Sequence, residues 1–235
     1  MVAAYLSICR EAGARPMYAS ADMLFQIADK CIRDYLWLME SIFSRSGLSI
    51  SEFLSSQIDV ELQNDGMRAA AGAKMTLFRE RLASAPAEAN QFVDGLARIT
   101  ALIQSTGRNY EQLRTPERGI FWYRVHGSPV SAEHNAVIRD AAQAGFLRLL
   151  GDSEIEELRF RVHASLAPQY DFSYRGAYYP AGELSDGDIS ALRSASTTQA
   201  MTRAVNAIVS RITGRRTKSG LDNQLALGDE GMSDG

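Results

Sequence analysis

The spacing of apolar residues changes along the chain and divides it into three stretches. Over residues 1–106, apolar residues recur every three or four positions, as on the buried side of amphipathic helices, and prolines and glycines fall mainly between these segments. Residues 107–180 alternate helical with extended patterns and concentrate the aromatic residues. Helical spacing returns over residues 181–214. The polar, glycine-rich remainder is typical of a disordered tail.

The first stretch predicts a series of amphipathic helices separated by short breaks. Serine or aspartate stands ahead of several of them as a candidate N-cap, and Pro86 suits the first turn of the last one. The expected helices cover residues 2–12, 21–29, 28–43, 51–63, 67–83 and 87–104. In the segment ADKCIRDYLWLM, the apolar residues form one stripe, and Arg33 falls on a different face from Ile32 and Tyr35.

The middle stretch predicts a helix followed by a β-hairpin. Residues 132–144 have the spacing of a helix, and Gly145 is expected to end it in the left-handed conformation. The extended segments 146–150 and 158–163 flank an acidic turn at residues 151–157. This order is the layout of a winged helix, in which the helix enters the major groove of DNA and the hairpin touches phosphates.

A winged helix would present polar side chains of the helix and arginines of the hairpin to DNA. The candidate DNA-binding residues are His134, Asn135, Arg139 and Gln143 on the helix and Arg148, Arg159 and Arg161 on the hairpin. On the second strand the arginines alternate with Phe160 and Val162, so we expect them to face solvent or DNA. Alternatively, the arginines form exposed ion pairs with Glu156, Glu157 or Asp140, and such pairs stabilise little.

The overall charge favours a protein partner over DNA, whereas the winged-helix order of segments favours DNA. The chain of 235 residues is 46% hydrophobic and 23% charged, and its formal net charge is −3. Residues 107–180 contain nine arginines, no lysine and nine acidic residues, so this stretch is neutral overall. Because affinity for DNA comes largely from neutralising phosphates, a neutral domain binds DNA weakly by itself.

Sequence motifs for phosphate, metal or nucleophilic chemistry are absent. There is no GxxxxGK[ST] loop to hold phosphates and no apolar run ending in Asp-Glu to hold magnesium. GxSxG, HExxH and CxxC do not occur, and no spacing of serine, histidine and aspartate implies a triad. The three histidines lie far along the chain from Cys9 and Cys31, so no metal site is expected. We therefore assign no catalytic residue and expect no enzyme.

The sequence favours a soluble cytoplasmic protein without a membrane partner. No apolar run approaches the roughly 18–20 residues of a membrane span, and the N-terminal segment lacks the basic residues of a signal peptide. An enzyme with an unrecognised pocket is a third alternative, for which residues 163–165 and the tyrosines Tyr174, Tyr178 and Tyr179 offer polar groups. Aromatic clusters of this kind more often belong to a hydrophobic core.

Three stretches together resemble a known family. Residues 18–43 resemble the small helical lid that follows the nucleotide-binding core in AAA+ ATPases. LRTPERGIF precedes the winged-helix-like region, and FRVHASLAPQYDFSYRGAYYP closes it. In this order, over roughly residues 5–185, the chain resembles the C-terminal half of prokaryotic ATPases related to the origin-recognition-complex family.

The resemblance assigns a role to Arg33. In that family the lid helix carries the sensor-2 arginine, which reaches the γ-phosphate of ATP bound to the nucleotide-binding core, and Arg33 in CIRD is the matching residue. A glycine commonly opens this motif, whereas Lys30 stands nearby here. Alternatively, Arg33 forms a surface ion pair with Asp29 or Asp34, or has a packing role.

The expected fold is mainly α, with a helical lid-like bundle followed by a winged-helix domain with a small β wing. The expected division is a lid-like domain with linker helices at 1–106, a winged-helix-like domain at 107–184, a C-terminal helix at 185–214 and a disordered tail at 215–235.

The resemblance implies the non-catalytic C-terminal part of an origin-recognition-like ATPase, whose nucleotide-binding core is truncated, separately encoded or lost. Such a part would contact double-stranded DNA, an AAA+ core or another protein, and ATP would be held only when the chain is joined to a core. The alternative is a helical, winged-helix protein–protein adaptor that does not touch DNA.

We expect the isolated chain to fold without hydrolysing ATP, because phosphoryl transfer needs both a loop that holds phosphate and an acidic ligand for the metal ion. The measurement is the steady-state release of phosphate by the purified chain. Robust turnover that disappears when one of the chain's own residues is replaced would contradict this expectation.

Overall fold

The computed structural model describes residues 2–81, 86–105, 117–124, 131–151, 157–175 and 179–214. The helices in this part of the chain are α1 (Val2–Glu11), α2 (Ala21–Ile27), α3 (Ile32–Ser46), α4 (Ile50–Ser55), α5 (Val60–Arg81), α6 (Pro86–Ser105), α7 (Ala132–Gln143), α8 (Ala167–Tyr170), α9 (Asp186–Arg193), α10 (Thr198–Thr213) and the 3-10 helix η2 (Ala164–Leu166). The strands are β1 (Arg118–Arg124), β2 (Leu147–Leu149), β3 (Glu157–Val162) and β4 (Tyr179–Leu184). The described chain is therefore mainly α-helical with a small sheet, as the sequence predicts.

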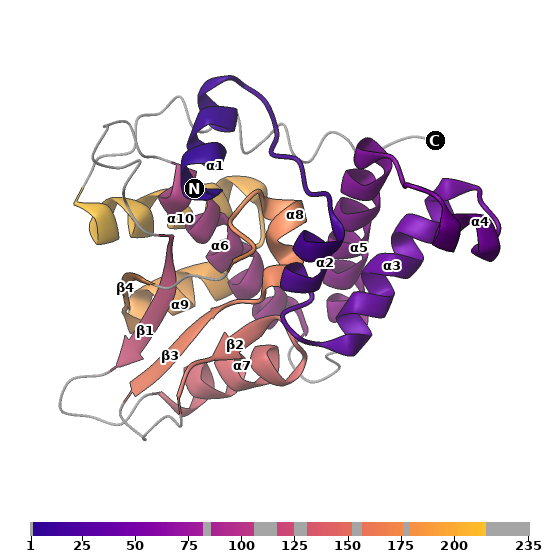
Figure 1. The fold of residues 1–235 in the computed structure, drawn as a ribbon. Coiled ribbons are helices and arrows are strands. Elements are labelled where there is room, and N and C mark those ends of the chain that lie inside the picture. Colours follow the sequence, from indigo (N-terminus) through magenta and orange to yellow (C-terminus); the bar gives the residue numbers. More distant parts are fainter. Residues whose placement is uncertain are drawn as a thin grey trace.

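The four strands form one sheet in the order β2-β3-β1-β4. Strand β3 pairs antiparallel with both β2 and β1, and β4 pairs parallel with β1. The predicted hairpin is therefore present as β2 and β3, and β1 and β4 enlarge the sheet beyond it. Figure 1 shows the sheet and α7 at one side of the molecule and α3, α4 and α5 at the other.

Helix α6 supplies the centre of the hydrophobic core. Its residues Phe92, Val93, Leu96 and Ile99 are fully buried. The helix packs against α5 and α1 of the helical side and against β1, β3, α7, α9 and α10 of the sheet side. The ring of Phe92 lies 6.2 Å from that of Phe160 on β3, measured between centroids. One continuous core therefore crosses from the helices to the sheet.

A glycine sets the distance between α3 and α5. A Cβ atom added to Gly66 would lie 2.6 Å from Cγ1 and 2.8 Å from Cα of Ile42. Such contacts are shorter than non-bonded atoms tolerate, so the backbone of α5 approaches α3 only because residue 66 has no side chain. The same approach lets the hydroxyl of Ser41 donate to the carbonyl of Gly66 at 2.8 Å.

Helix α7 ends at a glycine, as the sequence predicts. Gly145 has a φ of +81°, in the left-handed region. Its amide donates to the carbonyl of Ala142 at 3.0 Å, and the amide of Phe146 donates to that of Ala141 at 2.9 Å. These two bonds form a Schellman motif, which satisfies the last carbonyls of the helix and turns the chain into β2.

The predicted helix over residues 51–63 is wrong. Helix α4 ends before Asp59, and α5 begins after it. The carboxylate of Asp59 accepts from the amides of Glu61 at 2.8 Å and Leu62 at 3.2 Å. This side chain therefore starts a new helix at the point where the apolar spacing alone continues without a break.

The predicted single helix over 185–214 is also wrong, because the chain forms α9 and α10 there. Thr197 separates them, and its hydroxyl accepts from the amide of Ala200 at 3.1 Å as the N-cap of α10. Residues 181–184, which have helical spacing, belong to β4 because they pair with β1. The expected hairpin turn at 152–156 and the expected tail at 215–235 lie outside the described residues.

The two glycines of α5 give opposite predictions. Gly66→Ala should lower the free energy of unfolding by about 1–2 kcal/mol, because overpacking against α3 outweighs the better helix propensity of alanine. Gly72→Ala is the matched control: its added Cβ would meet only the side chain of Gln169 at 3.4 Å. It should raise stability by up to about 1 kcal/mol. Urea unfolding of both variants measures the difference, and equal effects would contradict the close approach of the helices.

Candidate functional site

The turn between α2 and α3 holds two consecutive residues in a strained conformation. Asp29 has a φ of +49° and Lys30 a φ of +65°, and neither is glycine. A side chain in this left-handed region costs about 1–2 kcal/mol per residue. The turn therefore needs contacts elsewhere that hold it in place.

The carboxylate of Asp29 provides those contacts. It pairs with Arg148 on β2 at 2.7 Å and with Arg161 on β3 at 2.9 Å. These arginines lie directly opposite each other on neighbouring strands. Like charges in that position repel, so the anion between them stabilises both the strand pair and the turn.

The expected orientation of Arg161 toward solvent or DNA is wrong. Its neighbours Phe160 and Val162 are buried as predicted. However, the side chain of Arg161 is only 12% exposed, because the α2–α3 turn covers this face of the hairpin. Arg148 is also held by Asp29, although 44% of its side chain remains exposed.

A second layer of polar residues lies behind Asp29. Asp34, buried in the first turn of α3, accepts from the ammonium of Lys74 on α5 at 2.7 Å. Lys74 also donates to the hydroxyl of Ser165 in η2 at 2.8 Å. Burial lowers the pKa of Lys74, whereas the Asp34 carboxylate opposes that shift.

His163 lies between the two carboxylates. Its ring nitrogens are 3.8 Å from Asp29 and 3.7 Å from Asp34. Its Nδ1 accepts from the amide of Ser165 at 3.2 Å, which places the ring proton on Nε2. Burial, reinforced by the Lys74 ammonium, lowers the pKa of His163 to about 4, so the imidazole is neutral at pH 7. We call the whole set the turn network: Asp29, Asp34, Lys74, Arg148, Arg161, His163 and Ser165.

Arg33 lies at the solvent-exposed edge of the turn network. Its side chain is 68% exposed, and it faces Asp34 at 3.8 Å, which is one of the ion pairs that the sequence suggests. Three apolar side chains of the same two helices are also exposed: Phe25 is 60%, Ile32 71% and Leu36 58% exposed. We call these four residues the α2–α3 surface.

The candidate DNA-binding residues of α7 are not gathered on one open face. His134, expected to point outward, is 6% exposed, because α9 covers it. Arg139 donates to the side chain of Asn135 at 2.7 Å, and both are half-buried. Gln143 is exposed. On β3, Arg159 pairs with Glu157 at 2.5 Å, which confirms the alternative prediction for this arginine.

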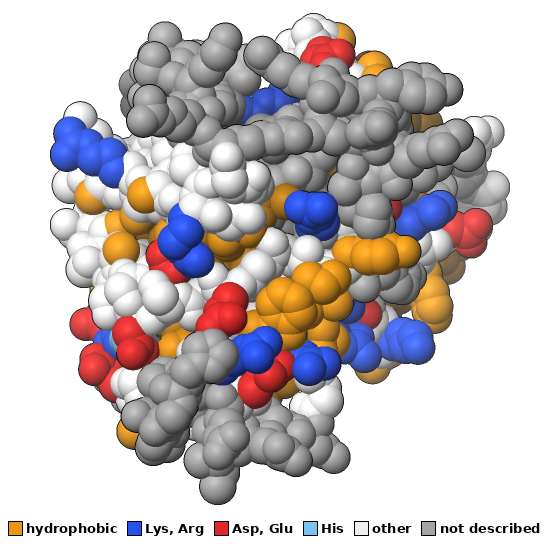
Figure 2. All heavy atoms as spheres, turned by 90° about the vertical axis from the view of Figure 1, so that its left-hand side faces the viewer, with side chains coloured by type: hydrophobic (Ala, Val, Ile, Leu, Met, Phe, Trp, Pro, Cys, Tyr) orange, Lys and Arg blue, Asp and Glu red, His pale blue; other side chains and the backbone are white. Residues whose placement is uncertain are grey.

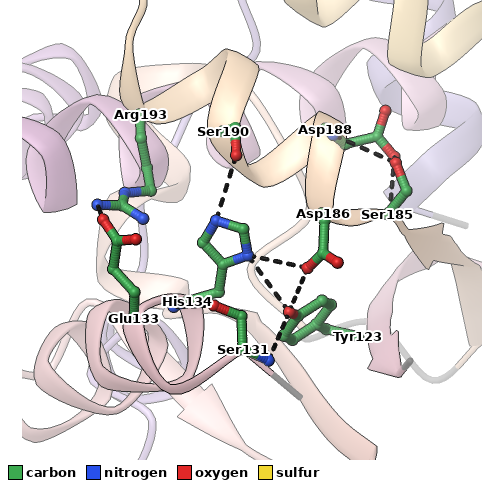
Figure 3. Close-up of polar contacts among 9 residues, drawn as sticks. All are labelled: Tyr123, Ser131, Glu133, His134, Ser185, Asp186, Asp188, Ser190 and Arg193. Carbon is green, nitrogen blue, oxygen red and sulfur yellow. Dashed lines mark hydrogen bonds and ion pairs between the residues drawn. The ribbon is translucent and has the colours of Figure 1, made fainter. Parts of the chain in front are cut away.

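Figure 3 shows what surrounds His134. Its Nδ1 lies 3.0 Å from Oδ1 of Asp186, and its Nε2 lies 3.2 Å from the hydroxyl of Ser190, both on α9. The hydroxyl of Tyr123 on β1 donates to the same Asp186 oxygen at 2.5 Å and accepts from the amide of Ser131 at 3.1 Å. Strand β1 and helices α7 and α9 thus meet at one polar cluster.

The surroundings of Tyr123 and Asp186 determine the protonation state of each side chain. Burial and the bond to Asp186 raise the pKa of Tyr123 to about 12, so its hydroxyl stays protonated. The hydrogen bond from Tyr123, followed by that from His134, lowers the pKa of Asp186. Asp186 is therefore an anion at neutral pH. Beside the cluster, the Arg193 guanidinium pairs with both Glu88 and Glu133, which joins α9 to α6 and α7.

Comparison with models of known protein families shows the family to which this chain belongs. Residues 1–180 match the ORC-CDC6-like family model. The chain belongs to the ORC-CDC6-like family. The resemblance to ATPases related to the origin-recognition-complex family, predicted over roughly residues 5–185, is thereby confirmed. Searches of the curated proteins and of the solved structures found no match. Among the described residues of this ORC-CDC6-like chain, no helix combines the length and the apolar character needed to cross a bilayer.

Sequence reasoning missed most of the turn network in this ORC-CDC6-like chain. The helix expected to begin at residue 28 begins at Ile32 instead, and the polar pair Asp29 and Lys30 was the one signal for the turn. Lys74, His163 and Ser165 give no such signal, because they meet the turn only through the tertiary fold.

The strained turn gives a prediction for Lys30. Lys30→Gly should raise the free energy of unfolding by about 0.5–1 kcal/mol, because glycine adopts a positive φ without strain but loses more entropy on folding. Lys30→Ala removes the charge and keeps the Cβ atom, so it should give no gain. Thermal unfolding of the two variants separates backbone strain from charge. An equal gain in both would contradict strain as the cause.

Proposed function

We propose that this chain is the non-catalytic lid and winged-helix part of an origin-recognition-like AAA+ ATPase, and that its α2–α3 surface docks on a nucleotide-binding core. The observation that carries the proposal is the setting of Arg33. An exposed guanidinium stands in the first turn of α3, α2 and α3 also carry three exposed apolar side chains, and the turn between these helices is tied to the sheet. Exposed apolar side chains together with an exposed arginine have the composition of a protein interface.

The backbone of the turn supports the sensor-2 assignment of Arg33. The family motif commonly opens with a glycine, and Lys30, three residues before Arg33, has the left-handed conformation that glycine adopts readily. The local shape of the motif is therefore kept although the glycine is replaced. Arg33 would then face the γ-phosphate of ATP held by the docked core.

The order of elements supports a winged helix in the sheet region. Strand β1, helix α7 and the hairpin of β2 and β3 follow one another along the chain. Strand β1 pairs with the edge of β3 that faces away from β2. In this arrangement α7 takes the place of the recognition helix. The domain would act as a rigid support for the lid or as a contact for a partner.

The charges favour a protein partner over DNA. The exposed residues of α7 include Glu133, Ala136 and Gln143, so this helix presents little positive charge. Arg148 and Arg161 are engaged by Asp29. On the face seen in Figure 2, Lys and Arg side chains are interspersed with Asp and Glu side chains and with apolar groups. Binding to DNA depends mainly on neutralised phosphates, which such a surface does not favour.

Docking can be measured with a purified Walker-motif core of an origin-recognition-like ATPase. Leu36→Ser should weaken binding of the core by about tenfold, because a central apolar anchor of an interface is worth about 1–2 kcal/mol or more. Arg33→Ala should bind the core but fail to change its ATP turnover. The matched controls are Leu54→Ser and Arg45→Ala, which alter an exposed leucine on α4 and an exposed arginine at the far end of α3.

Binding that is equal in wild type and Leu36→Ser would contradict docking through the α2–α3 surface. A parallel titration with duplex DNA over a salt series tests the other partner. Salt-dependent binding that weakens in Arg159→Ala would move the assignment to DNA.

A further inference from the structure

The contact of the Ser190 hydroxyl is not the bond that most often holds a serine or threonine hydroxyl inside a helix. Thr100, Ser105 and Thr213 each donate to the backbone carbonyl four residues earlier, at 2.8, 2.7 and 2.7 Å. That bond is the usual one for a serine or threonine within a helix. The hydroxyl of Ser190 instead lies 3.2 Å from Nε2 of His134. Its direction is therefore set by the histidine.

The protons of the cluster make His134 a base toward Ser190. The Asp186 carboxylate can only accept, so Nδ1 of His134 carries the proton that points to it, across 3.0 Å. In the neutral imidazole, Nε2 then has a lone pair that accepts the hydroxyl proton of Ser190. The hydroxyl of Tyr123 donates to Asp186 and fixes the carboxylate. The order serine, imidazole, carboxylate is that of a nucleophilic relay.

Exposure differs along the relay in the way that such chemistry needs. Ser190 is exposed on α9, whereas only 8% of the His134 side chain is exposed. The nucleophile is thus reachable from solvent, and the base is shielded. Figure 3 shows Ser190 and Asp186 on the same helix, on either side of the imidazole ring.

We propose that Ser190 is a nucleophile activated by His134 and oriented through Asp186, and that it takes acyl groups from small activated esters. In the step, a bond forms between Oγ of Ser190 and the carbonyl carbon, and the bond from that carbon to the leaving oxygen breaks. The hydroxyl proton passes to Nε2 of His134 and from there to the departing alkoxide or phenoxide. The product is an ester on Ser190.

The position of Ser190 limits how far the reaction proceeds. Its amide lies within α9, where it donates to the carbonyl of the preceding turn and is not available to an oxyanion. We therefore expect acylation of Ser190 with slow release by water, so that the modified serine accumulates. This behaviour makes covalent labelling the direct test.

The test uses the full chain and a small alkyl fluorophosphonate, followed by mass spectrometry of the peptide that contains Ser190. Attack by Oγ forms the phosphorus–oxygen bond, fluoride leaves, and the proton goes to His134. Wild type should be labelled at Ser190, and Asp186→Asn should be labelled at least about tenfold more slowly, because a carboxylate that orients the base is lost.

The controls separate a reactive serine from a structural one. Ser190→Ala should abolish the label, and its melting temperature should stay close to that of wild type because the residue is exposed. Ser194→Ala is the matched control: Ser194 is an exposed serine at the end of the same helix whose hydroxyl donates to the carbonyl of Ala191 at 3.4 Å. It should leave labelling unchanged. Equal labelling of Ser190 and Ser194, or an unchanged rate in folded Asp186→Asn, would overturn the proposal and leave the cluster as a structural link.

Discussion

The position of the α2–α3 turn relative to the sheet depends on one carboxylate. Asp29 lies between two arginines that face each other across β2 and β3, and it belongs to a turn whose backbone is strained. Without Asp29, neither the arginine pair nor the turn is favourable. The two arginines repel each other, and the turn has a positive φ at two residues that carry side chains. Removing one partner from a buried ion pair costs about 3–5 kcal/mol. The interaction therefore fixes where Arg33 stands.

The second layer of the turn network makes this link stiff. Lys74 reaches Asp34 on α3 and Ser165 in η2, so three elements share one ammonium. A neutral His163 fills the space between the two carboxylates without adding a charge. A partner that binds the α2–α3 surface would consequently act on a surface that is coupled to the sheet, and not on a hinged lid.

Local signals in the sequence predict the helices and strands of this fold well, but they do not predict which of these elements come into contact. Apolar spacing predicts most of the helices but misses the breaks at Asp59 and Thr197. Gly145 predicts the end of α7, because a left-handed cap depends on a few neighbouring residues. Alternation on β3 correctly separates Phe160 from Arg161, but it does not say what covers the arginine. The sequence likewise places His134 on the polar side of α7. Its partner Ser190 is 56 residues away, so only the packing of α9 brings them together.

The central place of α6 has a consequence for how such a chain can be altered in evolution. This helix buries residues against the helices before it and against the sheet and helices after it. Neither side can complete its interior before the other is present, so the two sides should gain and lose structure together. Recombination can exchange surface features such as the α2–α3 surface. A break beside α6 would leave two fragments, each with an apolar face open to water.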